Sequence, residues 1–189
     1  MTNLNVVGVV HTLTATLEDA GIEYAISGAL ALAYWSAPRA TLDVDVALNV
    51  PASALPFLLD TLINSGYELR HDALEAAQRG DFGARMGGIR IDFFLPVLPI
   101  SLDAISRRVQ VPFGDRDIWI LSAEDLMVFK LIFGRTKDFA DIERLVAAQR
   151  EKLEWDYLQQ QLVRIFEPDD SRFLKYLELR KLSRAAEPH

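Results

Sequence analysis

The chain has 189 residues and a formal net charge of −7, with half of its residues hydrophobic and a quarter charged. This length allows one large domain or a domain with an appendage, and folding is expected to bury roughly 70% of the unfolded surface. The absence of cysteine excludes a disulfide framework and thiolate metal sites. The acidic balance disfavours a general nucleic-acid binder, because the phosphate backbone requires a basic footprint.

The same features bear on cellular location. A chain without cysteine fits a reducing cytoplasm. Residues 1–10 carry no Lys or Arg ahead of their short apolar run, which makes them a poor secretory signal. No stretch approaches the ~20 apolar residues that span a bilayer. We therefore expect a cytoplasmic protein with no membrane partner.

Residues 1–121 show a mixed pattern of helical and strand periodicity. Helices are expected over residues 5–20, 28–38, 51–64 and 73–78. Strands are expected over residues 23–27, 39–48, 67–71, 82–86, 89–95, 109–113 and 118–121. Gly87-Gly88 suits a primed hairpin turn between two of these strands, because glycine tolerates positive φ at both central positions.

From Ser122 onward the pattern is entirely helical. Ser122 and Asp125 form a candidate capping box, with Asp in place of Glu, for a helix through Phe133. Further helices are expected over residues 137–149, 155–166 and 170–186. The sequence therefore predicts an α+β fold with a mixed sheet and flanking helices over 1–121, and a helical C-terminal third over 122–189 packed on that core.

An acidic pair stands out in the run Arg39-Ala-Thr-Leu-Asp-Val-Asp-Val-Ala-Leu. Side chains two apart on a strand share a face, so Asp43 and Asp45 leave one face while Val44 and Val46 bury on the other. Two carboxylates so placed repel each other, and a shared divalent cation would remove the repulsion. The alternative is an exposed acidic edge strand.

A third acid, Asp92, alternates with apolar residues on a later strand. Alone it indicates a solvent-facing carboxylate, but together with Asp43 and Asp45 it favours a metal site. Mg²⁺ is commonly held by a few carboxylates and substrate phosphates. Two such ions stabilise the attacking and leaving oxygens of an in-line displacement at phosphorus. Arg39 is expected on the face of Asp43, where it either contacts phosphate or balances the acids.

Other positions allow both a structural and a functional interpretation. Gly28 lies between a strand and a helix, where it permits close backbone approach to an anion at the helix N-terminus or simply makes a tight turn. Lys130 follows an apolar helical stripe, which by itself indicates a snorkelling surface lysine. Asp138 lies in a first helical turn, where an acid is usually a cap or dipole effect. For Asp141, one turn later, a functional and a structural role stay equally open.

Several segments together resemble a known motif set. Ile26-Ser-Gly-Ala-Leu-Ala, then Pro38-Arg-Ala-Thr-Leu-Asp-Val-Asp, then Ile91-Asp92 is similar to the pattern of the DNA polymerase β-type nucleotidyltransferase superfamily. The run Leu121-Ser-Ala-Glu-Asp-Leu-Met-Val-Phe-Lys-Leu-Ile-Phe-Gly-Arg-Thr-Lys-Asp-Phe-Ala-Asp-Ile resembles the AbiEii-type toxins, nucleotidyltransferases of bacterial toxin–antitoxin systems. The resemblance spans residues 20–147 and implies a nucleotidyltransferase-like fold.

The resemblance also implies roles for the acids. Asp43, Asp45 and Asp92 would be catalytic and would ligate Mg²⁺, with two ions expected. Asp92 would be the third ligand or the base that activates the attacking hydroxyl.

For the nucleotide, an NTP such as ATP, the resemblance implies a second group of residues. Gly28 would lie under the triphosphate, and Arg39 is a further candidate phosphate contact. Lys130 would contact the triphosphate and neutralise developing charge. Asp138 would organise that lysine or the nucleotide. Ala29 departs from the family pattern of Gly or Ser, because it offers a backbone N–H but no hydroxyl.

These roles define a Mg²⁺-dependent enzyme that transfers NMP from an NTP to an acceptor hydroxyl and releases pyrophosphate. The resemblance implies the tRNA 3′ end as acceptor, a role as a growth-inhibiting toxin, and a cognate antitoxin as partner. Two alternatives stay open. In the first, the enzyme modifies a small molecule or a protein side chain. In the second, the fold binds a nucleotide or a partner protein without turnover, because Ala29 replaces the family's Gly or Ser.

Overall fold

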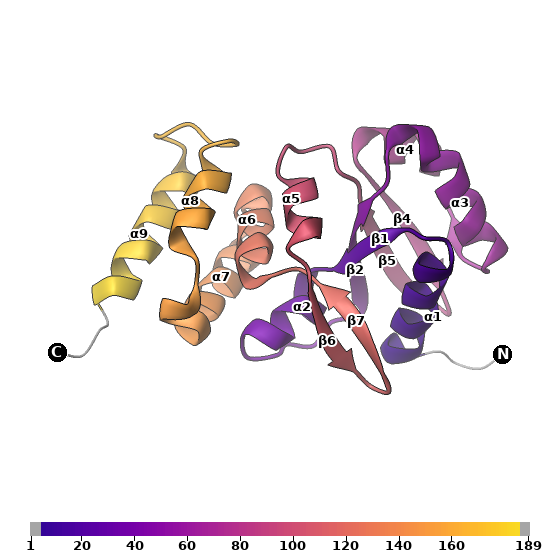
Figure 1. Ribbon diagram of the computed structural model, residues 1–189, viewed down its shortest axis with the longest axis horizontal. Coiled ribbons are helices and arrows are strands. Elements are labelled where there is room, and N and C mark those ends of the chain that lie inside the picture. The colour runs from indigo at the N-terminus through magenta and orange to yellow at the C-terminus, as the bar shows by residue number, and fades with distance from the viewer. Residues whose placement is uncertain (1–4, 186–189) are drawn as a thin grey trace. The chain divides into compact units, whose positions relative to one another are not determined.

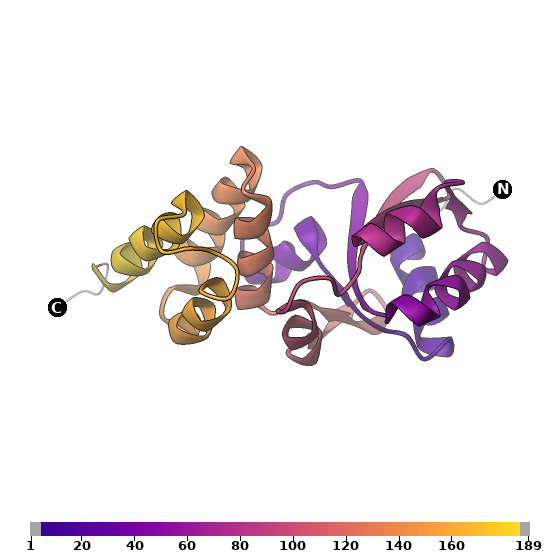
Figure 2. The same ribbon diagram turned by 90° about the horizontal axis from the view of Figure 1, so that it is seen from above.

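The computed structural model describes residues 5–185 (Figures 1 and 2). Two predictions fall partly outside this range: the poor secretory signal of residues 1–10, at residues 1–4, and the end of the last helix, at residue 186. The chain divides into two compact units, one comprising Met1–Leu30 with Ala40–Leu121 and the other Ala31–Arg39 with Ser122–His189. The segment 31–39 thus groups with the helical unit, which the sequence did not indicate.

The first unit is built on a seven-stranded mixed sheet with the strand order β3-β4-β5-β2-β1-β7-β6. The strands are β1 (Glu23–Ile26), β2 (Asp43–Asn49), β3 (Glu68–Leu69), β4 (Asp81–Met86), β5 (Ile89–Phe94), β6 (Val109–Phe113) and β7 (Arg116–Ile120). The pairs β2–β5 and β1–β7 are parallel, and the other neighbours are antiparallel. The predicted mixed sheet, flanking helices and C-terminal helices are confirmed.

The hairpin between β4 and β5 confirms the predicted turn. Met86 pairs with Ile89, and the two glycines between them have φ of 57° and 84°. Positive φ at both central positions is the geometry of a primed turn, whose twist matches that of the flanking strands. This turn sets the register that carries Arg90 and Asp92 along β5.

One face of the central strands forms the core of the first unit. Val44, Val46, Ile91 and Phe93 have no exposed surface, and burying each such side chain stabilises the fold by about 1.5–3 kcal/mol. The helices α1 (Val6–Asp19), α3 (Leu55–Asn64) and α4 (Ala73–Arg79) cover this apolar face (Figure 1). A 3₁₀ turn, η1 (Ala52–Ala54), precedes α3.

A short helix on the other side of the sheet was not predicted. This helix, α5 (Ser101–Ser106), packs against β1 and β2 on the side away from α1 and α3 (Figure 1). It has six residues and no side-chain N-cap, and Asp103 in its first turn is the start signal that it carries.

The second unit is helical. Its elements are α6 (Ala123–Phe133), α7 (Thr136–Gln149), η2 (Arg150–Lys152), α8 (Trp155–Leu162), α9 (Ser171–Ala185) and the part of α2 (Gly28–Trp35) from Ala31 onward. Leu131, Leu145, Leu158 and Tyr176 are fully buried in its core. Within residues 5–185, no helix combines the length and apolarity that crossing a bilayer requires.

The start of α6 refines the predicted capping box. Ser122 is the N-cap, and its hydroxyl oxygen accepts the Asp125 backbone N–H at 3.1 Å, as expected. The same hydroxyl donates to the Asp125 carboxylate at 2.6 Å, and the Tyr157 hydroxyl donates to that carboxylate at 2.6 Å as well. The buried Asp125 is therefore held by two hydroxyl groups, one of them from α8.

Candidate active site

The three predicted acids lie on one face of the sheet. In the parallel pair of β2 and β5, Asp43 is opposite Arg90 and Asp45 is opposite Asp92. Neighbouring strands are about 4.8 Å apart, and residues in register point the same way. The expected meeting of Asp92 with the Asp43–Asp45 strand is therefore observed. Asp43 is exposed and Asp45 and Asp92 are partly exposed, so solvent reaches this acid patch.

Gly28 touches the acid patch directly. Its φ is +59°, and a Cβ built on it would lie 1.8 Å from Oδ2 of Asp45. The neighbouring Ser27 N–H donates to the Asp45 carbonyl at 2.8 Å. Glycine is required here for two reasons, because the turn needs positive φ and the Asp45 carboxylate occupies the space of a side chain. Ala29, the next residue, has its side chain buried.

Replacing Gly28 with alanine is expected to destabilise the first unit more than the same change at Gly21. Both glycines have φ near +60°, so both substitutions carry the left-handed penalty of roughly 1–2 kcal/mol. A Cβ at Gly21 meets nothing within 4 Å, whereas one at Gly28 collides with Asp45. We expect an additional cost of about 1–3 kcal/mol for Gly28→Ala, measured by urea unfolding. Equal costs for the two variants would contradict the contact.

Arg90 joins the acids on the same face, although it was not assigned to the predicted catalytic, nucleotide-binding or metal residues. Its Nε and Nη2 both lie 2.9 Å from Oδ1 of Asp92. The hydrogen bond to Asp92 and the charge of that carboxylate raise the pKa of Arg90, and the charges of Asp43 and Asp45 add to this effect. Strand alternation could have identified Arg90, because it stands two residues before Asp92.

The acid patch supplies the type of donor that Mg²⁺ prefers, since carboxylate oxygens suit hard divalent cations. Across residues 5–185, however, no three acidic or imidazole side chains are already arranged as a metal-binding group. In the acid patch, Oδ1 of Asp92 is engaged by Arg90. The residues fit a magnesium site chemically, provided that Asp92 releases its arginine.

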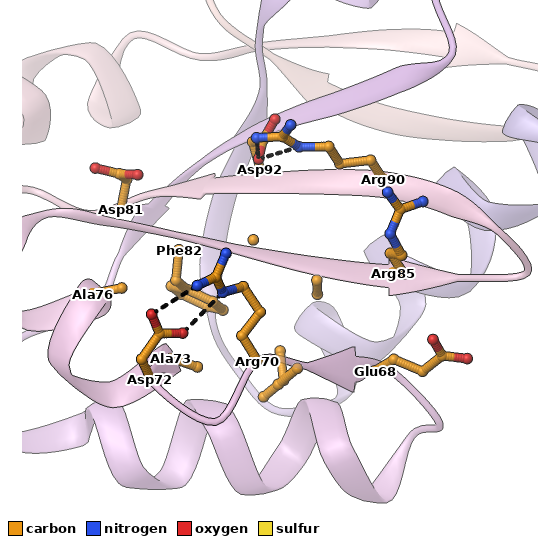
Figure 3. Close-up of a pocket in the computed structure, with 13 residues that line it drawn as sticks. Glu68, Arg70, Asp72, Ala73, Ala76, Asp81, Phe82, Arg85, Arg90 and Asp92 are labelled. Carbon is orange, nitrogen blue, oxygen red and sulfur yellow. Dashed lines mark hydrogen bonds and ion pairs between the residues drawn. The ribbon is translucent and has the colours of Figure 1, made fainter.

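A hollow of about 610 Å³ adjoins the acid patch at the β3–β4–β5 side of the sheet. Figure 3 shows the Arg90–Asp92 pair on one side of it and the Arg70–Asp72 pair on the other. This volume lies within the range of small-molecule sites, which is about 300–1,000 Å³. The structure thus provides space for a ligand next to Asp92.

Lys130 is not a surface lysine. Only 6% of its side chain is exposed, and its Nζ lies 2.7 Å from Oδ2 of Asp141 and 3.6 Å from Oδ1 of Asp138. All three residues belong to the helical unit. The snorkelling interpretation of Lys130 is therefore wrong, and Asp141, rather than the predicted Asp138, is its nearer acidic partner.

Asp141 is the centre of this buried cluster. Its side chain has no exposed surface, and Arg39 at 3.3 Å and Arg144 at 2.6 Å reach it in addition to Lys130. Burial opposes ionisation of Asp141, but the hydrogen bonds from Lys130 and Arg144 and the charges of Lys130 and Arg39 outweigh it and lower the pKa of Asp141. Asp138 instead receives the Arg135 side chain at 2.6 Å at the start of α7.

The expected position of Arg39 is corrected by the structure. Strand alternation back from Asp43 predicts Arg39 on the same face, but β2 begins only at Asp43, and Arg39 belongs to the helical unit. Its guanidinium pairs with Asp141 through Nε and Nη2, at 3.3 and 3.4 Å. Arg39 thus balances a buried acid of α7.

Comparisons with known proteins identify the fold. Neither a protein-family model nor a curated protein matches the sequence. The solution structure of the antibiotic-resistance factor ANT(2'')-Ia matches over 95% of this chain and 91% of that chain, with a TM-score of 0.59 and 13% identity. The lincosamide antibiotic adenylyltransferase LnuA, solved with bound lincomycin, matches over 78% of this chain and 99% of that chain, with a TM-score of 0.54 and 15% identity.

A third match is an antigenic nucleotidyltransferase-like protein from Paracoccidioides brasiliensis, with a TM-score of 0.54, 20% identity, and coverage of 91% of this chain and 93% of that chain. The identities are low, so the likeness concerns the arrangement of helices and strands. The chain has the nucleotidyltransferase fold, as its motifs predicted. Membership of the AbiEii-type toxins stays a prediction.

Proposed function

We propose that this protein is a Mg²⁺-dependent nucleotidyltransferase that transfers NMP from an NTP to an acceptor hydroxyl and releases pyrophosphate. One observation carries the proposal. The parallel register of β2 and β5 places Asp43, Asp45 and Asp92 on one solvent-accessible face, and Gly28 lies against Asp45 at the start of α2. This arrangement on a nucleotidyltransferase fold matches the chemistry that phosphoryl and nucleotidyl transfer require.

The residues of the acid patch have separate tasks in this proposal. Asp43, Asp45 and Asp92 would hold Mg²⁺, which neutralises negative charge on the phosphates and on the leaving oxygen when bound. Asp92 alternatively accepts the proton of the acceptor hydroxyl, since its carboxylate is partly exposed and borders the hollow. Gly28 and the Ala29 N–H lie at the N-terminus of α2, which favours an anionic phosphate.

We propose a structural role for Lys130 in place of the triphosphate contact that the resemblance implies. Its ammonium group is buried in a carboxylate cluster within the helical unit, which supports a structural function. We assign charge stabilisation of the triphosphate to the proposed metal site and to the N-terminus of α2.

A small hydroxyl-bearing molecule is the favoured acceptor. The solved structures that share the fold include an adenylyltransferase with bound lincomycin and ANT(2'')-Ia in complex with adenylyl-2''-tobramycin. The net charge of −7 also disfavours an extended nucleic-acid interface. The tRNA 3′ end, with a toxin role and a cognate antitoxin in the cytoplasm, is the second candidate, supported by the motif resemblance over residues 121–142.

The test is incubation of the purified chain with each radiolabelled NTP and Mg²⁺, with total tRNA, lincomycin or tobramycin as acceptor. We expect label on one acceptor class. Removal of divalent ions by EDTA is expected to abolish labelling, because the anionic carboxylates repel the phosphates when no cation lies between them. Label on tRNA alone would exclude the small-molecule assignment. Labelling that persists in EDTA would contradict the metal. Calorimetry that shows Mg²⁺–NTP binding without pyrophosphate release would support the non-catalytic alternative instead.

A further inference from the structure

We infer that Arg90 is a positioning residue that holds the acid patch together without a metal and competes with the divalent cation for Asp92. The inference rests on the proposed function, because it concerns metal binding at Asp43, Asp45 and Asp92. It goes further by assigning a role to a residue outside the motifs that resemble other nucleotidyltransferases.

The contacts of Arg90 are those of a counter-ion for the whole patch. Two of its guanidinium nitrogens lie 2.9 Å from the same oxygen of Asp92, and its register partner on β2 is Asp43. Asp45 is the register partner of Asp92 on the same face. The Arg90 guanidinium thus adds a positive charge beside carboxylates that repel one another.

A second arginine–aspartate pair at the same hollow can be compared with the Arg90–Asp92 pair. Arg70 also forms a two-point ion pair, with Asp72 at 3.0 and 3.1 Å. Asp72 stands on the turn into α4, whereas Arg90 bonds an acid, Asp92, whose register partner on β2 is the acid Asp45. Arg90 is bonded to Asp92 and is also the register partner of Asp43, so its guanidinium lies beside more than one acid of the patch.

A divalent cation and the Arg90 guanidinium cannot both be well accommodated at Asp92. They carry charges of the same sign, and both draw on the same carboxylate. The side chain of Arg90 is 58% exposed and borders the 610 Å³ hollow, so the guanidinium has room to turn away (Figure 3). Metal binding is therefore coupled to release of Arg90 from Asp92, and the bond lowers the affinity for the metal.

The test compares Arg90→Gln with Arg85→Gln in the full chain, with Mn²⁺ alone as the probe. Arg85 is the register partner of Arg90 on β4, and its guanidinium donates to the Gly88 carbonyl at 3.2 Å. Both variants remove one positive charge from the same face. Free Mn²⁺ measured by electron paramagnetic resonance gives the dissociation constant. We expect Arg90→Gln to bind Mn²⁺ about threefold to tenfold more tightly than wild type, and Arg85→Gln to change it less than about twofold.

The outcomes separate this inference from the proposed function. Arg90→Lys is expected to stay close to wild type, because an ammonium retains the competing charge. Equal Mn²⁺ affinity in wild type and Arg90→Gln, or equal tightening in Arg85→Gln and Arg90→Gln, would overturn the inference and leave the metal site in place. Absence of Mn²⁺ binding in all four proteins would overturn the metal site and the inference together. Thermal unfolding with and without Mn²⁺ gives a second readout, in which the metal should raise the melting temperature of Arg90→Gln by more than that of wild type.

Discussion

Replacing Asp45 with asparagine is expected to reduce nucleotidyl transfer by about a thousandfold while the chain stays folded. Asp45 is opposite Asp92 across β2 and β5, and its carboxylate packs on Gly28. Asp45 therefore contacts both the acid patch and the first residue of α2. Asparagine preserves this volume but removes the negative charge of a metal ligand. A thousandfold loss corresponds to ~4 kcal/mol of transition-state stabilisation, which is within the reach of metal-ion catalysis. The initial rate of label transfer from the preferred NTP measures the effect.

The matched control is Asp60→Asn, since Asp60 is an exposed acid on α3. It changes the net charge by the same amount and is expected to leave the rate within about twofold. Both proteins should unfold at nearly the temperature of wild type. A rate for Asp45→Asn above a tenth of the wild-type rate would remove Asp45 from the chemistry.

The acid patch could be predicted from the sequence because it depends on local geometry. Alternation along a strand fixes the face of each side chain, and the valines beside Asp43 and Asp45 identify the buried face. The turn at Gly87-Gly88 could also be predicted from local geometry, because glycine tolerates the positive φ that both positions adopt. The register that places Asp92 opposite Asp45 depends on the pairing of two strands distant in sequence. The sequence predicted that the three acids meet only if these strands are neighbours in matching orientation.

The buried cluster around Asp141 could not be predicted, because its members come from distant parts of the chain. Arg39 reaches Asp141 across 102 positions, and periodicity on α6 gave no reason to bury Lys130. A helix with apolar residues on one side is usually exposed on the other, but α6 is covered nearly all round, including the acids of its first turn. Burial on all sides is a tertiary property, so the pattern of α6 alone favoured a surface lysine.

Replacing Asp141 with asparagine is expected to lower the free energy of unfolding of the helical unit by about 3–5 kcal/mol. The side chain has no exposed surface and balances Lys130, Arg39 and Arg144, so its loss leaves buried positive charge without its central partner. Urea unfolding monitored by circular dichroism measures the change. Glu143→Gln is the control on the same helix, because Glu143 is half-exposed in its pair with Lys175 and is expected to change stability by less than about 1 kcal/mol.

The dependence on pH gives a second test of the same residue. The cluster lowers the pKa of Asp141 below its ordinary value, so the stabilisation from its charge is complete above a pH of about 4. It is lost as the pH falls through the lowered pKa, because the folded state must then bind a proton that weakens its contacts with the cations. The difference between wild type and Asp141→Asn should therefore be constant from pH 5 to pH 7 and shrink under more acidic conditions. A difference that is already small at pH 7 would mean that solvent, rather than Asp141, balances Lys130 and its neighbouring arginines.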